Sequence, residues 1–79
     1  MNRTVLVSFE DASRVSCVDV FVRADGTYGF EEFRVDLDIG YGWKSLGRYS
    51  HLVFLTGEDA LHEAQSRVSW IPQLETWRW

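Results

Sequence analysis

Apolar and polar side chains alternate most regularly in residues 17–23. Val18, Val20 and Val22 recur at every second position, which is the spacing of one face of a β-strand. The pattern therefore predicts a strand with one apolar face. The positions between the valines point to the other face and hold Cys17, Asp19, Phe21 and Arg23.

The dipeptide Asp25-Gly26 follows this strand and is typical of a two-residue hairpin loop, because both positions accept a positive φ. Such a loop predicts a return strand over residues 28–37. The cross-strand pairs that it implies are Val22–Gly29, Phe21–Phe30 and Val18–Phe33. The valine face, the predicted core face, then gains Phe33, Val35 and Leu37. The reverse face collects Phe21, Tyr28 and Phe30.

This register has two unfavourable consequences. It sets Asp19 opposite Glu32, which is a like-charge pair, and it points Glu31 toward the valine face. A β-bulge at Glu31-Glu32 relieves both by shifting the later register. The simple register and the bulged one both remain open at this point.

Shorter apolar runs predict the remaining strands. Residues 4–9 form a first strand in which Val5, Val7 and Phe9 share a face, and residues 10–13 form a polar turn. Residues 36–42 are turn-like and precede a short strand over residues 43–46. Residues 49–55 are apolar and fit either a fourth strand or an extended crossover.

A helix is predicted from Thr56, whose hydroxyl can cap it, with Asp59 three residues later as a variant capping box. Pro72 ends the helix at about Trp70. Glu63 and Arg67 form an i,i+4 pair on its polar side. Its apolar stripe, expected to meet the valine face, consists of Leu61, Ala64, Val68 and Ile71.

Together these elements predict one α+β domain spanning residues 1–79. Its architecture is a two-layer one, with a three- to four-stranded antiparallel meander packed by one C-terminal helix. Residues 72–79 form an aromatic tail that carries Trp77 and Trp79. We expect this tail to be ordered, because two indoles separated by one residue lie on the same side of an extended segment.

Composition narrows the function classes. The chain has 8 Lys and Arg against 12 Asp and Glu, a formal net charge of −4, which argues against tight binding of duplex nucleic acid. A lone cysteine, Cys17, excludes an internal disulfide framework. The sequence has no apolar run near 18 residues and no apolar leader at its start, so we expect a cytoplasmic protein without a membrane span.

Residues with catalytic or metal-binding chemistry are few. Catalysis by Cys17 would need His51 or His62 beside it, and a lone cysteine flanking a strand is more often a packed side chain. Residues 36–47 begin like a calcium loop but lack its later ligands and its glycine. We therefore predict no catalytic residue, no cofactor and no metal site.

The reverse face of the hairpin is the strongest hint of function, since aromatic rings and guanidinium groups gather there. Such a face stacks bases or docks a protein, unless the first strand or the tail covers it. The candidate interaction surface consists of Phe21, Arg23, Tyr28, Phe30, Arg34, Trp43, Trp77 and Trp79.

Several stretches also carry a resemblance. They are the hairpin over residues 18–34, a "GW…G…S…F" segment over residues 42–54, and helix residues 58–61 with Val68 and Trp70. Together they resemble a family of short proteobacterial proteins of unknown function, which implies no activity. The layout of strands and helix is also similar to the arm-type DNA-binding domains of phage integrases, from which the acidic balance departs.

The sequence thus favours a non-enzymatic protein-interaction module that contacts a protein partner or a second copy of itself. The alternative is a nucleic-acid-binding domain. It would use the rings of Phe21, Tyr28 and Phe30 together with the basic side chains of Arg23, Arg34, Lys44 and Arg48.

Overall fold

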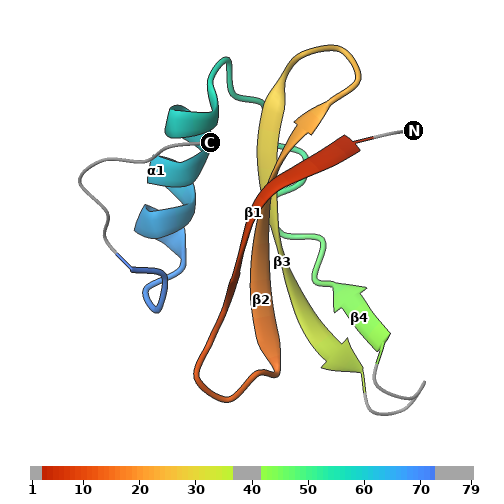
Figure 1. Cartoon of the computed structure of the whole chain (residues 1–79), viewed down its shortest axis with the longest axis vertical. Coiled ribbons are helices and arrows are strands. Elements are labelled where there is room, and N and C mark those ends of the chain that lie inside the picture. The colour runs from red at the N-terminus through yellow and green to blue at the C-terminus, as the bar shows by residue number, and fades with distance from the viewer. Residues whose placement is uncertain (1–2, 37–41, 73–79) are drawn as a thin grey trace.

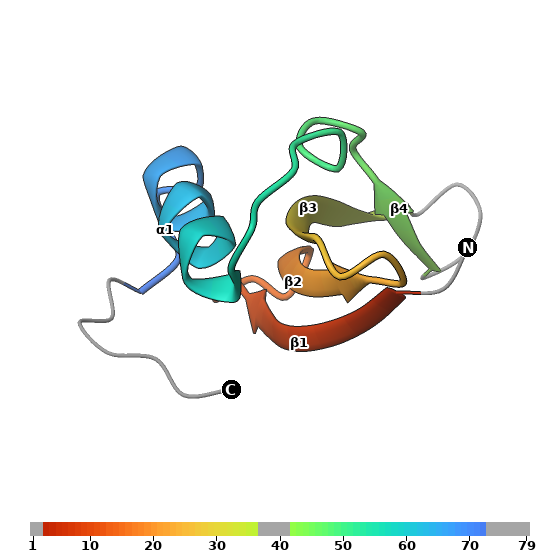
Figure 2. The ribbon, with the colours of Figure 1, turned by 90° about the horizontal axis from the view of Figure 1, so that it is seen from above.

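Four strands and one helix follow one another in the computed structural model, which describes residues 3–36 and 42–72. Each strand pairs antiparallel with its neighbour in sequence, giving one sheet of order β1-β2-β3-β4 (Figure 1). The helix lies on one side of this sheet (Figure 2). The predicted α+β meander with a C-terminal helix is confirmed. The elements are β1 (Arg3–Glu10), β2 (Ser16–Arg23), β3 (Tyr28–Asp36), β4 (Gly42–Ser45) and α1 (Gly57–Arg67).

A β-bulge interrupts β1. The pairing of β1 with β2 shifts between Val5 and Val7, so Leu6 is the extra residue. Val7 lies opposite Val20 and packs with Phe9 against the core. Val5 turns to the face away from α1. The prediction that Val5 shares a face with Val7 and Phe9 is therefore wrong.

The hairpin between β2 and β3 has a three-residue loop. The backbone N–H of Arg23 donates to the carbonyl of Thr27 at 2.7 Å, and the N–H of Gly26 donates to the carbonyl of Arg23 at 3.0 Å. Gly26 has a φ of +87°, whereas Asp25 is not among the described residues with positive φ. The loop is thus a turn over Ala24 and Asp25 followed by a left-handed glycine, and the predicted two-residue loop is wrong.

The extra loop residue displaces β3 by one position from the predicted register, which sends each of its side chains to the opposite face. Val20 lies opposite Phe30, so Phe30 joins the valine face. Phe33 lies opposite Cys17 on the other face, and Val35 follows it by alternation. The prediction that Phe33 and Val35 line the core is therefore wrong.

Glu31 and Glu32 exchange their predicted faces for the same reason. Glu31 lies opposite Asp19, and Glu32 lies opposite Val18. The described pairing of β2 with β3 contains no register shift, so the alternative of a bulge at these glutamates is also wrong. The carboxylates of Asp19 and Glu31 have separate hydrogen-bond donors. Asp19 accepts a 2.7 Å hydrogen bond from the hydroxyl of Ser8, and Glu31 accepts from backbone amides.

The core lies between α1 and the valine face. Val18 and Val20 meet the predicted helix stripe there, and Phe30 fills the space between strands and helix. Val22 is only half-buried. The buried cluster consists of Val18, Val20, Phe30, Ala60, Leu61, Ala64, Val68 and Ile71.

The helix begins as predicted and ends earlier. The backbone N–H of Asp59 donates to the hydroxyl of Thr56 at 3.1 Å, which confirms the N-cap. Regular helix stops at Arg67, three residues before the predicted end. A turn follows, and the side-chain amide of Gln65 donates to the carbonyl of Pro72 at 2.9 Å. Val68 and the residues after it therefore reach the core from a turn.

Residues 46–56, which we call the strap, connect β4 to α1 along the edge of β3 (Figure 2). Phe54 forms an isolated antiparallel bridge with Tyr28, with both backbone hydrogen bonds at 2.9 Å. Tyr49, Leu52 and Phe54 turn inward and pack against the core. Of the two predicted alternatives for residues 49–55, the crossover is observed and the strand is not, but residues 49–52 form a turn, so the crossover is not extended throughout.

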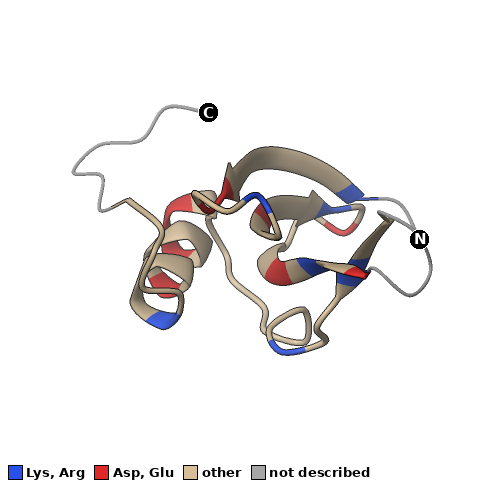
Figure 3. Ribbon diagram, turned by 90° about the horizontal axis from the view of Figure 1, so that it is seen from below, with Lys and Arg blue, Asp and Glu red and all other residues tan. Residues whose placement is uncertain are grey.

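Acidic side chains predominate on the helix, whereas the sheet carries charges of both signs (Figure 3). In the described residues, α1 carries three acidic side chains against one basic side chain, Arg67. Most of the described basic residues lie on the sheet and the strap: Arg3, Arg23, Arg34, Lys44 and Arg48. Leu37, the predicted turn over residues 37–41 and the tail over residues 73–79 lie outside the described residues.

Candidate functional site

The face of the sheet away from α1 is the candidate site, and we call it the open face. Residues directly opposite one another on antiparallel strands share a face, so the register assigns its members. From β1 to β4 the described members are Arg3, Val5, Ser8, Glu10, Val15, Cys17, Asp19, Phe21, Arg23, Gly29, Glu31, Phe33, Val35, Trp43 and Ser45.

Phe21 lies on the open face between Val5 and Gly29, yet its side chain is 0% exposed. The guanidinium of Arg3 lies 4.1 Å from its ring centre, and the guanidinium of Arg23 lies 5.1 Å away. These are cation–π distances, and the two arginines cover the ring. Phe21 and Arg23 thus lie together as predicted, but the ring is buried beneath the charges.

Arg23 is held by four hydrogen bonds within the chain. Its guanidinium donates to the hydroxyl of Thr27 at 3.3 Å and to the carbonyl of Tyr28 at 3.0 Å. It also donates to two carbonyls of the strap, those of Ser50 at 2.8 Å and Leu52 at 3.0 Å. Arg23 therefore fastens the strap to the hairpin, and its guanidinium is already bound.

Gly29 provides the space that Arg23 crosses. A Cβ atom at this position would lie 2.6 Å from a guanidinium nitrogen of Arg23 and 2.9 Å from the ring of Phe21. Both distances are shorter than real Cβ contacts, so any other residue would displace the arginine. The presence of glycine at the second position of β3 is thus explained by a close approach.

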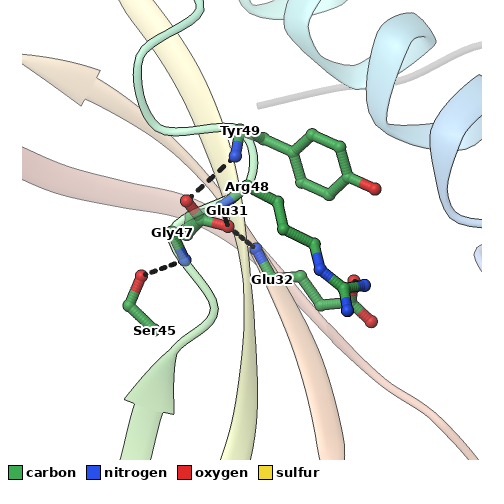
Figure 4. Close-up of polar contacts among 6 residues, drawn as sticks. All are labelled: Glu31, Glu32, Ser45, Gly47, Arg48 and Tyr49. Atoms are coloured by element: carbon green, nitrogen blue, oxygen red, sulfur yellow. Dashed lines mark hydrogen bonds and ion pairs between the residues drawn. The ribbon is translucent and has the colours of Figure 1, made fainter.

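Glu31 binds the strap from the other side. Its carboxylate is 0% exposed and accepts hydrogen bonds from four backbone N–H groups, and Figure 4 draws three of the donor residues, Glu32, Arg48 and Tyr49. Glu32 donates at 2.8 Å, Arg48 at 3.2 Å, Tyr49 at 3.1 Å and Ser50 at 2.9 Å. The carboxylate is therefore a buried anion inside a nest of amides.

Burial acts to raise the pKa of Glu31, but the hydrogen bonds from the N–H groups of Tyr49, Glu32 and Ser50 outweigh it and hold the pKa below its usual value. The carboxylate is therefore charged at neutral pH. Nearby, Arg48 forms a 3.4 Å ion pair with the buried Glu32. These carboxylates hold the strap in place, which is a structural role.

Cys17 is buried on the open face as a free thiol. Burial, together with the negative charges of Asp19, Glu10 and Glu32, raises the pKa of Cys17 to about 11. It is therefore a thiol at neutral pH, whereas the thiolate is the reactive form.

Both histidines, His51 and His62, are exposed. In residues 3–36 and 42–72, no three His, Cys, Asp or Glu side chains lie close enough to hold a metal ion.

The exposed apolar side chains of the open face gather at one end of the sheet. Val15 is 46% exposed and lies beside Val35, whose N–H donates to its carbonyl at 2.9 Å. Val35 lies opposite Trp43, which is 44% exposed. Phe33 is half-buried one row further in. We call Val15, Phe33, Val35 and Trp43 the apolar patch.

The structure divides the residues of the predicted interaction surface. Only Trp43 belongs to the apolar patch. Tyr28 and Phe30 face α1 instead, and Phe30 is fully buried, stacked on Tyr49 at 4.9 Å between ring centres. Arg34 is exposed and alternates away from the open face. Trp77 and Trp79 lie outside the described residues.

Sequence reasoning missed Val15, Phe33 and Val35 as surface residues. The register implied by a two-residue loop places Phe33 and Val35 in the core. Val15 lies before residues 17–23, where the alternating pattern begins, so no pattern indicates its face. The signal that identifies them is the three-residue loop, because the register it sets turns Phe33 and Val35 outward.

Comparison with known proteins found no match among family models, curated proteins or solved structures. The resemblance to short proteobacterial proteins therefore stays a prediction. Among the described residues, the one helix is too short and too polar to cross a membrane.

Proposed function

We propose that this chain is a non-enzymatic, cytoplasmic protein-interaction module that contacts its partner through the apolar patch. The observation that carries the proposal is the exposure of Trp43 and Val15 on the sheet face that α1 leaves uncovered. Tryptophan is enriched at the energetic centre of protein interfaces, because it combines a large apolar surface with one hydrogen-bond donor.

The surroundings of the patch fit this role. Glu10 and Ser45 lie on the adjacent row of the open face, in line with Phe33. An apolar centre with polar residues around it is the usual anatomy of a non-obligate interface.

The alternative of a nucleic-acid-binding face receives less support. Base stacking needs exposed rings, and Phe21 and Phe30 are both fully buried. Phosphate binding needs available cations, whereas the guanidinium of Arg23 is bound to backbone carbonyls and that of Arg48 is paired with Glu32. The net charge of −4 argues in the same direction.

A non-enzymatic role is proposed because the buried groups with shifted protonation act within the fold. The carboxylate of Glu31 is bound by four amides of its own chain. The thiol of Cys17 has a raised pKa, which opposes nucleophilic chemistry. A protein-contact role requires neither group.

Affinity enrichment from an extract of the source organism tests the proposal. The bait is the full chain, compared with Trp43→Ala, Val15→Asp and the control His62→Ala, which alters the exposed side of α1. We expect one or more proteins to be enriched by the wild type and the control. We also expect the direct affinity of each purified partner to fall about ten-fold or more with the two patch variants.

Two results would overturn the proposal. One is equal binding of every partner by the patch variants and the wild type. The other is salt-dependent retention of the wild type on single-stranded DNA or RNA that is lost in Arg34→Ala and Lys44→Ala. Circular dichroism of each variant checks that the fold is retained.

A further inference from the structure

The outer edge of β1 is a second surface with a defined chemistry. β1 is eight residues long and is the first strand in the sheet order, so β2 pairs with only one of its edges. An edge strand presents N–H and C=O groups that can pair with another chain. β1 contains no proline or lysine, and its two charges, Arg3 and Glu10, lie at its two ends.

These charges make β1 complementary to itself in the antiparallel direction. When a second copy pairs along the whole strand, Arg3 faces Glu10 of the second copy, and Glu10 faces Arg3 of the second copy. Two opposite-charge pairs then flank an apolar centre of Val5, Leu6 and Val7. Parallel pairing would instead set Arg3 beside Arg3 of the second copy, which like charges disfavour.

Because of the bulge at Leu6, residues that oppose each other in this antiparallel pairing lie on the same face of the sheet. Arg3 and Glu10 both lie on the open face, although seven positions separate them and strict alternation would place them on opposite faces. Val5 and Ser8, which would also pair, likewise share the open face. A regular strand paired with its own copy in this register would bring opposite faces together.

We infer that two copies of the chain associate through antiparallel pairing of β1, with Arg3 of each copy opposite Glu10 of the other. Such an association extends the four-stranded sheet of each copy into one continuous eight-stranded sheet around a two-fold axis. It rests on the proposed function as a protein-interaction module and names one partner as a second copy. The two apolar patches stay uncovered, so a dimer presents two equivalent contact surfaces.

Charge reversal tests the pairing by sedimentation over a concentration series. We expect the wild type to dimerise with concentration, and Glu10→Arg to weaken the dimer about ten-fold or more, because both flanking pairs become repulsive. Arg3→Glu should do the same. An equimolar mixture of the two variants should form a heterodimer, since each reversed charge then faces its opposite.

Cysteine cross-linking tests the register without changing Arg3, whose guanidinium covers the ring of Phe21. In a Cys17→Ala background, the variant with both Val5→Cys and Ser8→Cys should form an intermolecular disulfide, because these positions oppose each other in the paired strands. The matched control combines Thr4→Cys with Ser8→Cys. Thr4 and Ser8 lie on opposite faces of β1, so we expect no cross-link there.

A wild type that stays monomeric at every concentration would overturn the inference. A dimer that Glu10→Arg does not weaken would also overturn it, as would equal cross-linking of the Val5→Cys/Ser8→Cys variant and the Thr4→Cys/Ser8→Cys control. Its failure is separable from failure of the proposed function. Val15→Asp alters the apolar patch and should leave the dimer intact, whereas Arg3→Glu, at the end of β1 away from the patch, should leave binding at the patch intact.

Discussion

Glu31→Gln removes the charge that holds the strap while nearly preserving the size of the side chain. Four backbone amides at 2.8–3.2 Å donate to this carboxylate. A hydrogen bond to a charged group contributes about 1.5–3 kcal/mol, and a buried donor left unpaired costs about 1–3 kcal/mol. Glutamine keeps one carbonyl oxygen as an acceptor, which limits the loss.

We therefore expect Glu31→Gln to lower the free energy of unfolding by about 2–3 kcal/mol. That is a large share of the stability of a 79-residue domain, for which about 4–12 kcal/mol is expected. Urea denaturation followed by circular dichroism at pH 7 measures the change. The matched control is Glu63→Gln, which breaks the exposed 2.6 Å pair with Arg67 and should cost about 0.5 kcal/mol or less.

The pH dependence provides a second measurement. The pKa of Glu31 is lower in the folded chain than its usual value of 4.5, so the unfolded state binds a proton first as the pH falls. The stabilisation is complete above the unfolded pKa and is lost as the pH falls through the folded pKa. Wild type should lose stability below about pH 4.5, and Glu31→Gln should lose less over the same range. Equal stabilities of Glu31→Gln and Glu63→Gln at pH 7, with parallel pH profiles, would show that the Glu31 carboxylate does not stabilise the strap.

Three other perturbations have defined outcomes in urea or thermal unfolding. Gly29→Ala should destabilise by about 1–3 kcal/mol because its Cβ displaces Arg23, whereas a gain in stability would mean that the arginine moves freely. Leu61→Ala should cost about 2–4 kcal/mol and the exposed control His62→Ala nearly nothing, and equal melting temperatures would contradict the described core. Deleting residues 74–79 should lower the melting temperature, because their apolar side chains are expected to pack on the domain, and an unchanged temperature would contradict that expectation.

The helix and the core stripe were predictable because their signals are local. Thr56 is followed three residues later by Asp59 and then by a regular apolar spacing, and each signal requires only neighbouring residues. The strand containing Val18 and Val20 was predictable for the same reason. In these segments the local pattern and the tertiary structure agree.

The register of β3 was not predictable, because two hairpin loops fit the same dipeptide. A two-residue loop needs a positive φ at both Asp25 and Gly26, whereas the observed three-residue loop needs it only at the glycine. The difference is one residue, yet it decides whether Phe30 or Phe33 faces the helix. The same difference decides which side chains of β3 lie on the open face, and therefore which residues form the candidate surface.

The role of Glu31 was unpredictable for another reason. Three of its four partners are backbone amides of residues 48–50, and almost any residue type can supply a backbone amide, so no side-chain pattern indicates them. An acidic residue in a strand is ordinarily read as exposed, because burying a charge is costly unless it is paired and hydrogen-bonded. Here the required hydrogen bonds come from a segment seventeen or more residues away in the chain.

Residue-resolved hydroxyl-radical footprinting tests most directly whether the apolar patch is a protein-contact surface. The full chain is oxidised in cells and, separately, as dilute purified protein, and mass spectrometry reads the oxidation of each residue. We expect Trp43 and Phe33 to be oxidised in the purified protein and protected in cells, while His62 on α1 is oxidised equally in both. Equal oxidation of Trp43 and Phe33 in the two samples, or protection confined to α1, would contradict it.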